Sequence, residues 1–285
     1  MTTLDENLQL FAEQSFKEGI KSFDKRKGWR GPIDSFKSIK DWRIKLENFK
    51  NPDGLYNDFL AIVLEIKDDI LKVGTKKGRI IEITINELKI IKKKKINLKK
   101  EIKVGDIVVL KSNHQSQKVM LSQIPDVDGA MVVIDNYSGR VLAMVGGYNS
   151  NSSFNRAIQA KRQLGSAFKP FIYVSALENG YSPASKILDA PFVLNDQSSD
   201  GIWRPTNYGN KFYGLSTLRL GIEKSRNLMT VRLADELGLD KIAKISENLE
   251  IYESFPYLIS SSLGSLESTL IKITSAYASI ANGGK

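Results

Sequence analysis

The stretch QLGSAFKPF, residues 163–171, carries the most informative pattern in this chain. Ser166 stands at the start of a helical pattern that continues to Asn179, which places its hydroxyl near unpaired backbone N–H groups and the positive end of the helix dipole. Lys169 follows three positions later, on the same face one turn on, within reach of that hydroxyl. A desolvated lysine can lose its proton near neutral pH and act as a general base. The pattern therefore indicates a serine nucleophile with a lysine partner.

The Ser-x-x-Lys spacing is a weak signal by itself, because it arises often by chance. A second copy, Ser22-Phe23-Asp24-Lys25, is present, and we interpret it as ordinary surface. On spacing alone, Ser166 is better explained as the cap of a helix whose Lys169 is solvated. The surroundings of the motif have to decide between the two interpretations.

Composition narrows the possible chemistry. The 285 residues are 41% hydrophobic and 26% charged, which is typical of a globular protein. The chain has no cysteine and one histidine, His114, so a disulfide scaffold, a thiol nucleophile and a multi-histidine metal site are excluded. We expect no metal and no cofactor, and a base other than histidine. No window approaches the ~18 apolar residues of a membrane-spanning helix, and the first residues lack the features of a signal peptide.

The positive charge is concentrated in one segment. The net charge is +10, and residues 72–118 contain 14 Lys/Arg against 4 Asp/Glu, including the run Lys92–Lys95, while the rest balances at 28 against 28. Such a block can attract nucleic acid, an acidic polymer or an anionic membrane, or it can be a solvated face. The segment contains no Phe, Tyr or Trp, whereas barrels that bind single strands use aromatic stacking. We therefore expect no nucleic-acid partner.

The chain divides into three segments by pattern. Residues 1–57 are predicted to be a helical linker segment, with helices over 3–24, capped by Thr3, and near 34–49. Residues 58–125 hold five short runs rich in Ile, Val and Leu, which predict a small β-barrel of the oligonucleotide-binding (OB) type. Residues 126–285 begin with a hairpin signal around Asn136-Tyr137-Ser138-Gly139 and continue with helical patterns. The five predicted strands of the barrel are residues 60–66, 70–74, 79–85, 106–111 and 118–123.

The flank of Ser166 resembles the active-site serine region of class A penicillin-binding proteins, in FNRA (154–157) and QLGSAFKPF. Ser225-Arg226-Asn227 resembles the second motif of that family, Ser-x-Asn, although the letters also fit residues 153–155 and 246–248. Further stretches are similar to the family from one end of the chain to the other: TTLD (2–5), GWRGP (28–32), WRPTNY (203–208), KSRNL (224–228) and AYASIANGGK (276–285). The resemblance implies an α+β fold: a penicillin-binding, serine β-lactamase-like transpeptidase domain over residues 126–285, preceded by an OB-like barrel, which some members carry.

The resemblance also implies a mechanism. Ser166 would attack the carbonyl of a D-alanyl-D-alanine stem peptide, with Lys169 taking its proton, although the identity of the base is disputed for related enzymes. Ser225 would relay a proton to the leaving group, and Asn227 would hold Lys169 or the substrate backbone. A second peptide amine would then form the cross-link. Peptidoglycan stem peptides are therefore the implied partners, and β-lactams the implied inhibitors.

Several parts of the family pattern do not occur in these residues. The third motif, Lys-Ser/Thr-Gly, is not present before Lys285. The family's glycosyltransferase domain is not present either, nor is the membrane anchor that holds the family at the periplasmic face of the bacterial inner membrane. In the family, the strand with the third motif supplies one of two oxyanion donors. Losing one such donor costs about 100- to 1000-fold in rate. We therefore expect a piece of a bifunctional cell-wall synthase with reduced or no activity.

Other functions fit parts of the pattern. A β-lactamase or carboxypeptidase would share Ser166 and Lys169, and a penicillin sensor would be acylated without turning over stem peptide. A basic OB-like binding module, docking an acidic polymer or regulator beside an inert scaffold, belongs to another class. Charge reversal at Lys92–Lys95 separates that class from an enzyme, because it should abolish polymer binding and leave acylation of Ser166 unchanged.

Overall fold

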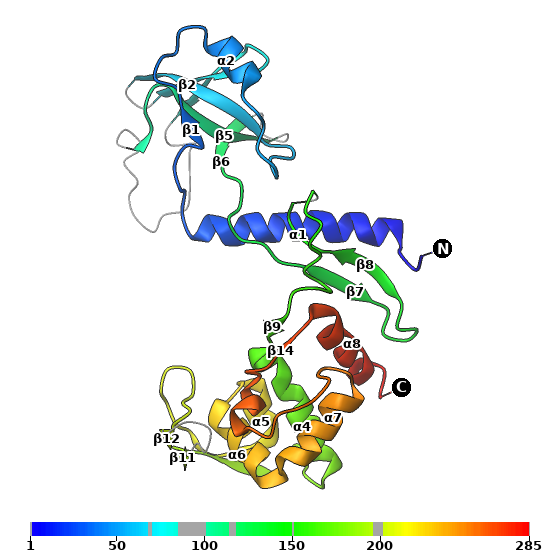
Figure 1. Ribbon diagram of the computed structural model, residues 1–285. Coiled ribbons are helices and arrows are strands. Elements are labelled where there is room, and N and C mark those ends of the chain that lie inside the picture. The colour runs from blue at the N-terminus through cyan, green and yellow to red at the C-terminus, as the bar shows by residue number, and fades with distance from the viewer. Residues whose placement is uncertain are drawn as a thin grey trace. The chain divides into compact units, whose positions relative to one another are not determined.

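The computed structural model describes residues 2–67, 70–84, 101–113, 118–149, 151–195 and 202–284. Three sequence features, Lys92–Lys95, His114 and Lys285, lie outside the described residues. The chain divides into two compact units (Figure 1). We call residues 6–131 with 145–155 the sheet unit, and residues 1–5, 132–144 and 156–285 the helix unit.

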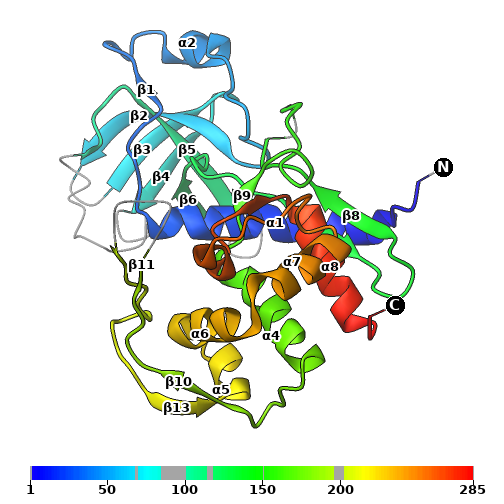
Figure 2. The same ribbon diagram turned by 60° about the horizontal axis from the view of Figure 1, so that its bottom comes forward.

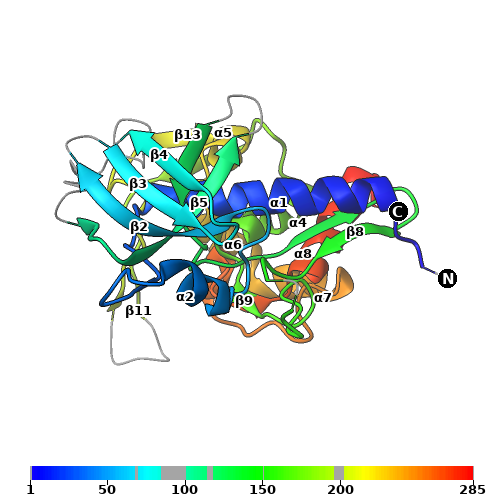
Figure 3. The ribbon, with the colours of Figure 1, turned by 90° about the horizontal axis from the view of Figure 1, so that it is seen from above.

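The sheet unit contains one antiparallel sheet with the strand order β1-β5-β2-β3-β4, and β6 also pairs with β5. Figure 3 shows β2, β3 and β4 as neighbours. The five strands that the sequence predicts in this region are confirmed as β2 to β6. The elements of the unit are α1 (Glu6–Arg26), β1 (Asp34–Ser35), α2 (Trp42–Asn48), β2 (Phe59–Lys67), β3 (Ile70–Thr75), β4 (Ile80–Thr84), β5 (Asp106–Asn113) and β6 (Lys118–Ser122).

The apolar run at the start of β2 is explained by burial on both faces of the sheet. Ala61 and Val63 belong to one hydrophobic cluster, and Leu60 and Ile62 to a second, which includes Leu46 of α2. All four of these strand residues are at most 2% exposed. Since successive side chains of a strand point to opposite faces, a strand covered on both sides needs a continuous apolar run.

Two local predictions for the N-terminal segment are wrong. The helical pattern near residues 34–49 gives a helix only in α2, because Asp34 and Ser35 pair with Ile107 and Asp106 of β5. The first helix begins at Glu6, and Thr3 does not cap it: its hydroxyl donates to the carbonyl oxygen of Val141 at 2.7 Å. In both places, pairing with a segment distant in sequence outweighs the local preference.

The helix unit has α4 at the centre of its core (Figure 2). Phe168, Phe171 and Ile172 are fully buried there, against Met229 and Leu233 of α6. The predicted hairpin around residues 136–139 is confirmed as β7 and β8. The elements are β7 (Met131–Ile134), β8 (Val141–Val145), β9 (Arg162–Gln163), η1 (Gly165–Phe168), α4 (Lys169–Glu178), β10 (Lys186–Asp189), β11 (Leu194–Asn195), β12 (Ile202–Trp203), β13 (Gly214–Thr217), α5 (Leu218–Glu223), α6 (Asn227–Leu237), α7 (Leu239–Asn248), η2 (Ile259–Leu263), β14 (Glu267–Ser268) and α8 (Leu270–Ala281).

Among the described helices, none combines the length and the apolar character needed to cross a membrane. In the same ranges, no three His, Cys, Asp or Glu side chains come together in a group that could hold a metal ion.

Candidate active site

Ser166 lies in the short 3-10 turn η1, which leads directly into α4. The backbone N–H of Lys169 donates to the carbonyl oxygen of Ser166, so the two residues are one tight turn apart. In a 3-10 turn, side chains three positions apart are eclipsed, which puts the hydroxyl and the lysine side chain on the same side. Ser166 is exposed, whereas Lys169 is 2% exposed. Within the described ranges, no hydrogen bond joins the Ser166 hydroxyl to the Lys169 amine.

The turn that carries Ser166 is held by backbone contacts from the far end of the chain. The N–H of Gly165 donates to the carbonyl oxygen of Gly264 at 2.9 Å, and Leu164 N–H donates to Leu266 at 3.3 Å. Gly264 has φ 73°, and a Cβ built on it would lie 2.1 Å from the Gly165 carbonyl oxygen. Only glycine permits this approach, because it lacks a Cβ and accepts a positive φ.

Buried aromatic rings hold the other side of the turn. Phe168 is fully buried, and its ring centroid lies 5.3 Å from that of Tyr252 and 5.9 Å from that of Phe255. The hydroxyl of Tyr277, in α8, donates to the carbonyl oxygen of Ala167 at 2.9 Å. An exposed serine is therefore presented by a turn that is fixed on both sides.

The amine of Lys169 is surrounded by oxygen acceptors of the Ser225-Arg226-Asn227 segment. Its Nζ donates to the Ser225 carbonyl oxygen at 2.7 Å, to Ser225 Oγ at 3.1 Å and to Asn227 Oδ1 at 2.6 Å. Burial lowers the pKa of Lys169 from 10.5 to about 8, because desolvation disfavours the ammonium form. A substantial fraction of Lys169 is then neutral just above neutral pH, as a general base requires.

Of the four residues that the sequence singles out, the structure joins Lys169, Ser225 and Asn227 by hydrogen bonds and places Ser166 one turn before Lys169. Ser225 reaches Lys169 twice because its backbone has φ 49°, in the left-handed region, which turns the chain just before α6. The Asn227 side chain has one possible orientation. Its Nδ2 donates to the Thr206 carbonyl oxygen at 2.8 Å, which leaves Oδ1 to accept from Lys169.

Sequence reasoning did not assign a role to Thr206 or Asn207. Both lie in WRPTNY, which the sequence marked only by resemblance. The side chain of Asn207 is 5% exposed and accepts from the N–H of Leu228, in the first turn of α6. A polar side chain that contacts the backbone of a distant helix leaves no periodic pattern in the sequence, so only the structure finds it.

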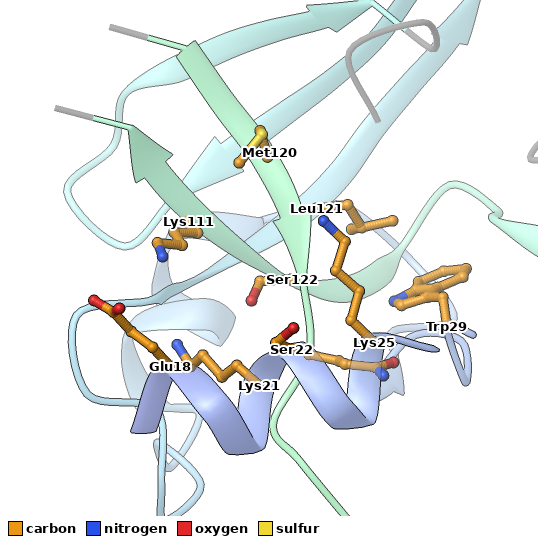
Figure 4. Close-up of a pocket in the computed structure, with 10 residues that line it drawn as sticks. Glu18, Lys21, Ser22, Lys25, Trp29, Lys111, Met120, Leu121 and Ser122 are labelled. Atoms are coloured by element: carbon orange, nitrogen blue, oxygen red, sulfur yellow. The ribbon is translucent and has the colours of Figure 1, made fainter. Parts of the chain in front are cut away.

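The second Ser-x-x-Lys copy lacks this environment. Ser22 and Lys25, both exposed, line a cleft of about 460 Å³ in the sheet unit (Figure 4). Its other lining residues are Glu18, Lys21, Trp29, Lys111, Met120, Leu121, Ser122 and Gln123. Lys21 is paired with the buried carboxylate of Asp58 at 2.9 Å, and Lys25 is not buried as Lys169 is. Identical spacing therefore gives a desolvated lysine at one place and a solvated lysine at the other.

Two family models match the chain. Residues 29–127 match the penicillin-binding protein OB-like domain, and residues 129–285 match the penicillin-binding protein transpeptidase domain. The chain belongs to the penicillin-binding protein transpeptidase family. The α+β fold and the OB-like domain expected from the sequence are confirmed.

Similar proteins agree with this assignment. Penicillin-binding protein 1A of Rickettsia conorii is 41% identical over all of this chain, and that of Pseudomonas aeruginosa is 33% identical. The crystal structure of penicillin-binding protein 1A from Haemophilus influenzae has a TM-score of 0.83, is 24% identical, and is matched over 99% of this chain and 42% of its own. The chain spans 36% of the length of the two curated relatives.

Proposed function

We propose that this chain is the transpeptidase part of a bifunctional peptidoglycan synthase, which cross-links stem peptides through an acyl-serine intermediate. The observation that carries the proposal is the position of an exposed Ser166 one turn before Lys169, whose amine is buried and held by Ser225 and Asn227. Family membership supports the same chemistry.

In the first half of the reaction, neutral Lys169 takes the proton of the Ser166 hydroxyl. The Oγ then attacks the carbonyl carbon between the two D-alanine residues of a stem peptide. The backbone N–H of Ser166, near the start of the turn, is one donor for the developing oxyanion. The C–N bond breaks, and the proton passes from Lys169 through Ser225 to the departing D-alanine amine.

In the second half, the amine of a neighbouring stem peptide attacks the acyl-enzyme. A new peptide bond forms, the ester bond to Ser166 breaks, and the serine regains its proton. Asn227 keeps the Lys169 amine in place through both halves. A β-lactam enters the first half only: its amide bond opens, the leaving group stays attached, and a slowly hydrolysed acyl-enzyme remains. Since the family acts on the cell wall, we place the chain at the periplasmic face of the bacterial inner membrane.

Labelling with a fluorescent penicillin, followed by intact mass and peptide mapping, tests the proposal. We expect one adduct, on Ser166, that is lost in Ser166→Ala. Ser22→Ala is the matched control, because it removes the serine of the second Ser-x-x-Lys copy and should leave labelling unchanged.

An adduct that persists in Ser166→Ala would contradict the assignment of the nucleophile. An unlabelled chain is compared with one extended past Lys285 through a Lys-Ser/Thr-Gly strand. If the extended chain also stays unlabelled, the proposed function is wrong.

A further inference from the structure

Asp189, the last residue of β10, is a fully buried carboxylate outside the four predicted site residues. A buried carboxylate is costly unless it is paired and hydrogen-bonded. Asp189 Oδ1 accepts from Asn207 Nδ2 at 2.6 Å, and Oδ2 lies 3.6 Å from Arg226 Nη1. Asn207 follows Thr206, whose carbonyl oxygen orients Asn227, and Arg226 directly precedes Asn227. These positions suggest what this carboxylate does.

The first partner, Asn207, forms hydrogen bonds through both the nitrogen and the oxygen of its side-chain amide. Besides Asp189, its Nδ2 donates to the Lys211 carbonyl oxygen at 2.9 Å, and its Oδ1 accepts from the Leu228 N–H at 3.2 Å. The residue before α6, Arg226, makes no side-chain cap, so Asn207 satisfies one of the unpaired donors of that helix from outside. Asn207 therefore joins the loop that contains Thr206 to the start of α6.

The second partner, Arg226, is the middle residue of the Ser-x-Asn motif. Its guanidinium carbon lies 3.2 Å from the centroid of the Tyr213 ring, and its side chain is 15% exposed. Arg226 is thus held between a carboxylate and an aromatic face. Ser225 and Asn227, the two residues that contact the Lys169 amine, flank it directly.

We propose that Asp189 and Asn207 are positioning residues of the active site, which hold the Ser225-Arg226-Asn227 segment against the Lys169 amine. Asn207 fixes the Thr206 carbonyl, which orients the Asn227 amide. Asp189 fixes both Asn207 and Arg226, so one carboxylate restrains the segment from two sides. Neither residue contacts the reacting atoms. The catalytic meaning of this inference rests on the proposed function. The geometric claim, that these residues hold the segment over the Lys169 amine, does not.

Asn207→Ala tests the inference by two measurements. The second-order rate of acylation by fluorescent penicillin should fall about 10- to 100-fold, because a misplaced catalytic group costs rate steeply. The titration midpoint of Lys169, followed by NMR of ¹³C-lysine and assigned with Lys169→Arg, should rise from about 8 toward 10.5, because water reaches an amine that is no longer covered. A merely structural role would lower the melting temperature and leave that midpoint unchanged.

Two further variants complete the experiment. Asn248→Ala removes an exposed asparagine at the end of α7 from another Ser-x-Asn letter match, and should change neither measurement. Asp189→Asn keeps the size and one acceptor for Asn207 but removes the charge that faces Arg226. Like Asn207→Ala, it should lower the acylation rate and raise the Lys169 midpoint, but by smaller amounts. It replaces Asn207→Ala if that variant does not fold.

The outcomes separate the two proposals. If the folded Asn207→Ala or Asp189→Asn chain has the wild-type acylation rate and the wild-type Lys169 midpoint, the positioning inference is overturned. If the wild-type chain is never acylated but the Lys169 midpoint still rises in the variants, the proposed function falls and the positioning stands.

Discussion

Lys169 shows how one side chain acquires its chemistry from its surroundings. Its three acceptors all come from Ser225 and Asn227, and its burial lowers its pKa to about 8. Three acceptors suit an ammonium group, which has three donors. In the neutral amine one donor is missing, and the Ser225 hydroxyl can then donate to the nitrogen. In the proposed mechanism, Ser225 is therefore a suitable relay for the proton that Lys169 would take from Ser166.

The pH dependence of acylation follows from this pKa. In the proposed mechanism, neutral Lys169 is the reactive form, and this form exists mainly above its pKa of about 8. The rate of acylation of Ser166 should therefore rise about tenfold per pH unit up to about pH 8 and level off above it. Stopped-flow measurements with fluorescent penicillin between pH 6 and 9.5 check this, with circular dichroism as the control for folding. A rate independent of pH over this range would show that Lys169 is not the base.

The position of the turn η1, which carries Ser166, depends on a segment about 100 residues later in the helix unit, after η2. η2 ends at Leu263, and Gly264 follows with a positive φ and its backbone directly against Gly165. β14 then pairs with β9, with Glu267 opposite Gln163, just before the turn begins. The position of Ser166 is therefore set by strand pairing and a glycine contact rather than by the helix propensity of its own segment.

Gly264→Ala tests this contact. Alanine at φ 73° costs about 1–2 kcal/mol in any position, but here its Cβ would also meet the Gly165 carbonyl oxygen, so η1 has to shift. We expect about 1–3 kcal/mol of further destabilisation and slower acylation of Ser166. Gly139→Ala is the matched control, with φ 70° and nothing within 4 Å of the new Cβ. Chemical denaturation and penicillin labelling of both variants measure the difference, and equal losses would contradict the role of the contact.

On the scale of the whole molecule, the two units have separate hydrophobic cores. One described cluster lies around α4 and α6, and two others cover the two faces of the sheet. In the sheet unit, the carboxylate of Asp24 is 1% exposed and connects several segments. It accepts from Arg30 Nη1 at 2.8 Å, from Gln123 Nε2 at 2.7 Å and from the Asp126 N–H at 3.2 Å.

Asp24→Ala should therefore destabilise the sheet unit alone. Its removal takes away the shared acceptor of Arg30, Gln123 and the Asp126 N–H, at a cost of about 0.5–1.5 kcal/mol for each hydrogen bond lost. Calorimetry should show a lower midpoint temperature for the unfolding transition of the sheet unit. The rate of Ser166 labelling should stay at the wild-type value. Glu47→Ala, which removes an exposed carboxylate of the same unit, is the control. If the midpoint temperatures of both transitions decrease together, the units do not unfold separately.

Local sequence patterns predicted most elements of this fold. The apolar runs of β2 to β6 and the periodic helices α6, α7 and α8 follow directly from which of their faces are buried. The errors fall where distant backbone groups compete with local preference. Asp34 and Ser35 join β5 instead of a helix, and Thr3 donates to Val141 instead of capping one.

The sequence by itself determined the residue types and the spacing of the candidate site: a serine at a helix start, a lysine three positions on, and a distant Ser-x-Asn. Spacing alone did not separate Ser166 and Lys169 from Ser22 and Lys25, because both pairs have the same residue types three positions apart. The resemblance of the flanking residues favoured Ser166, and only the tertiary structure shows the physical difference between the two pairs. It buries Lys169, brings Ser225 and Asn227 to its amine, and braces that segment from Asp189 and Asn207. Desolvation and orientation arise from residues far apart in the chain, so no local pattern encodes them.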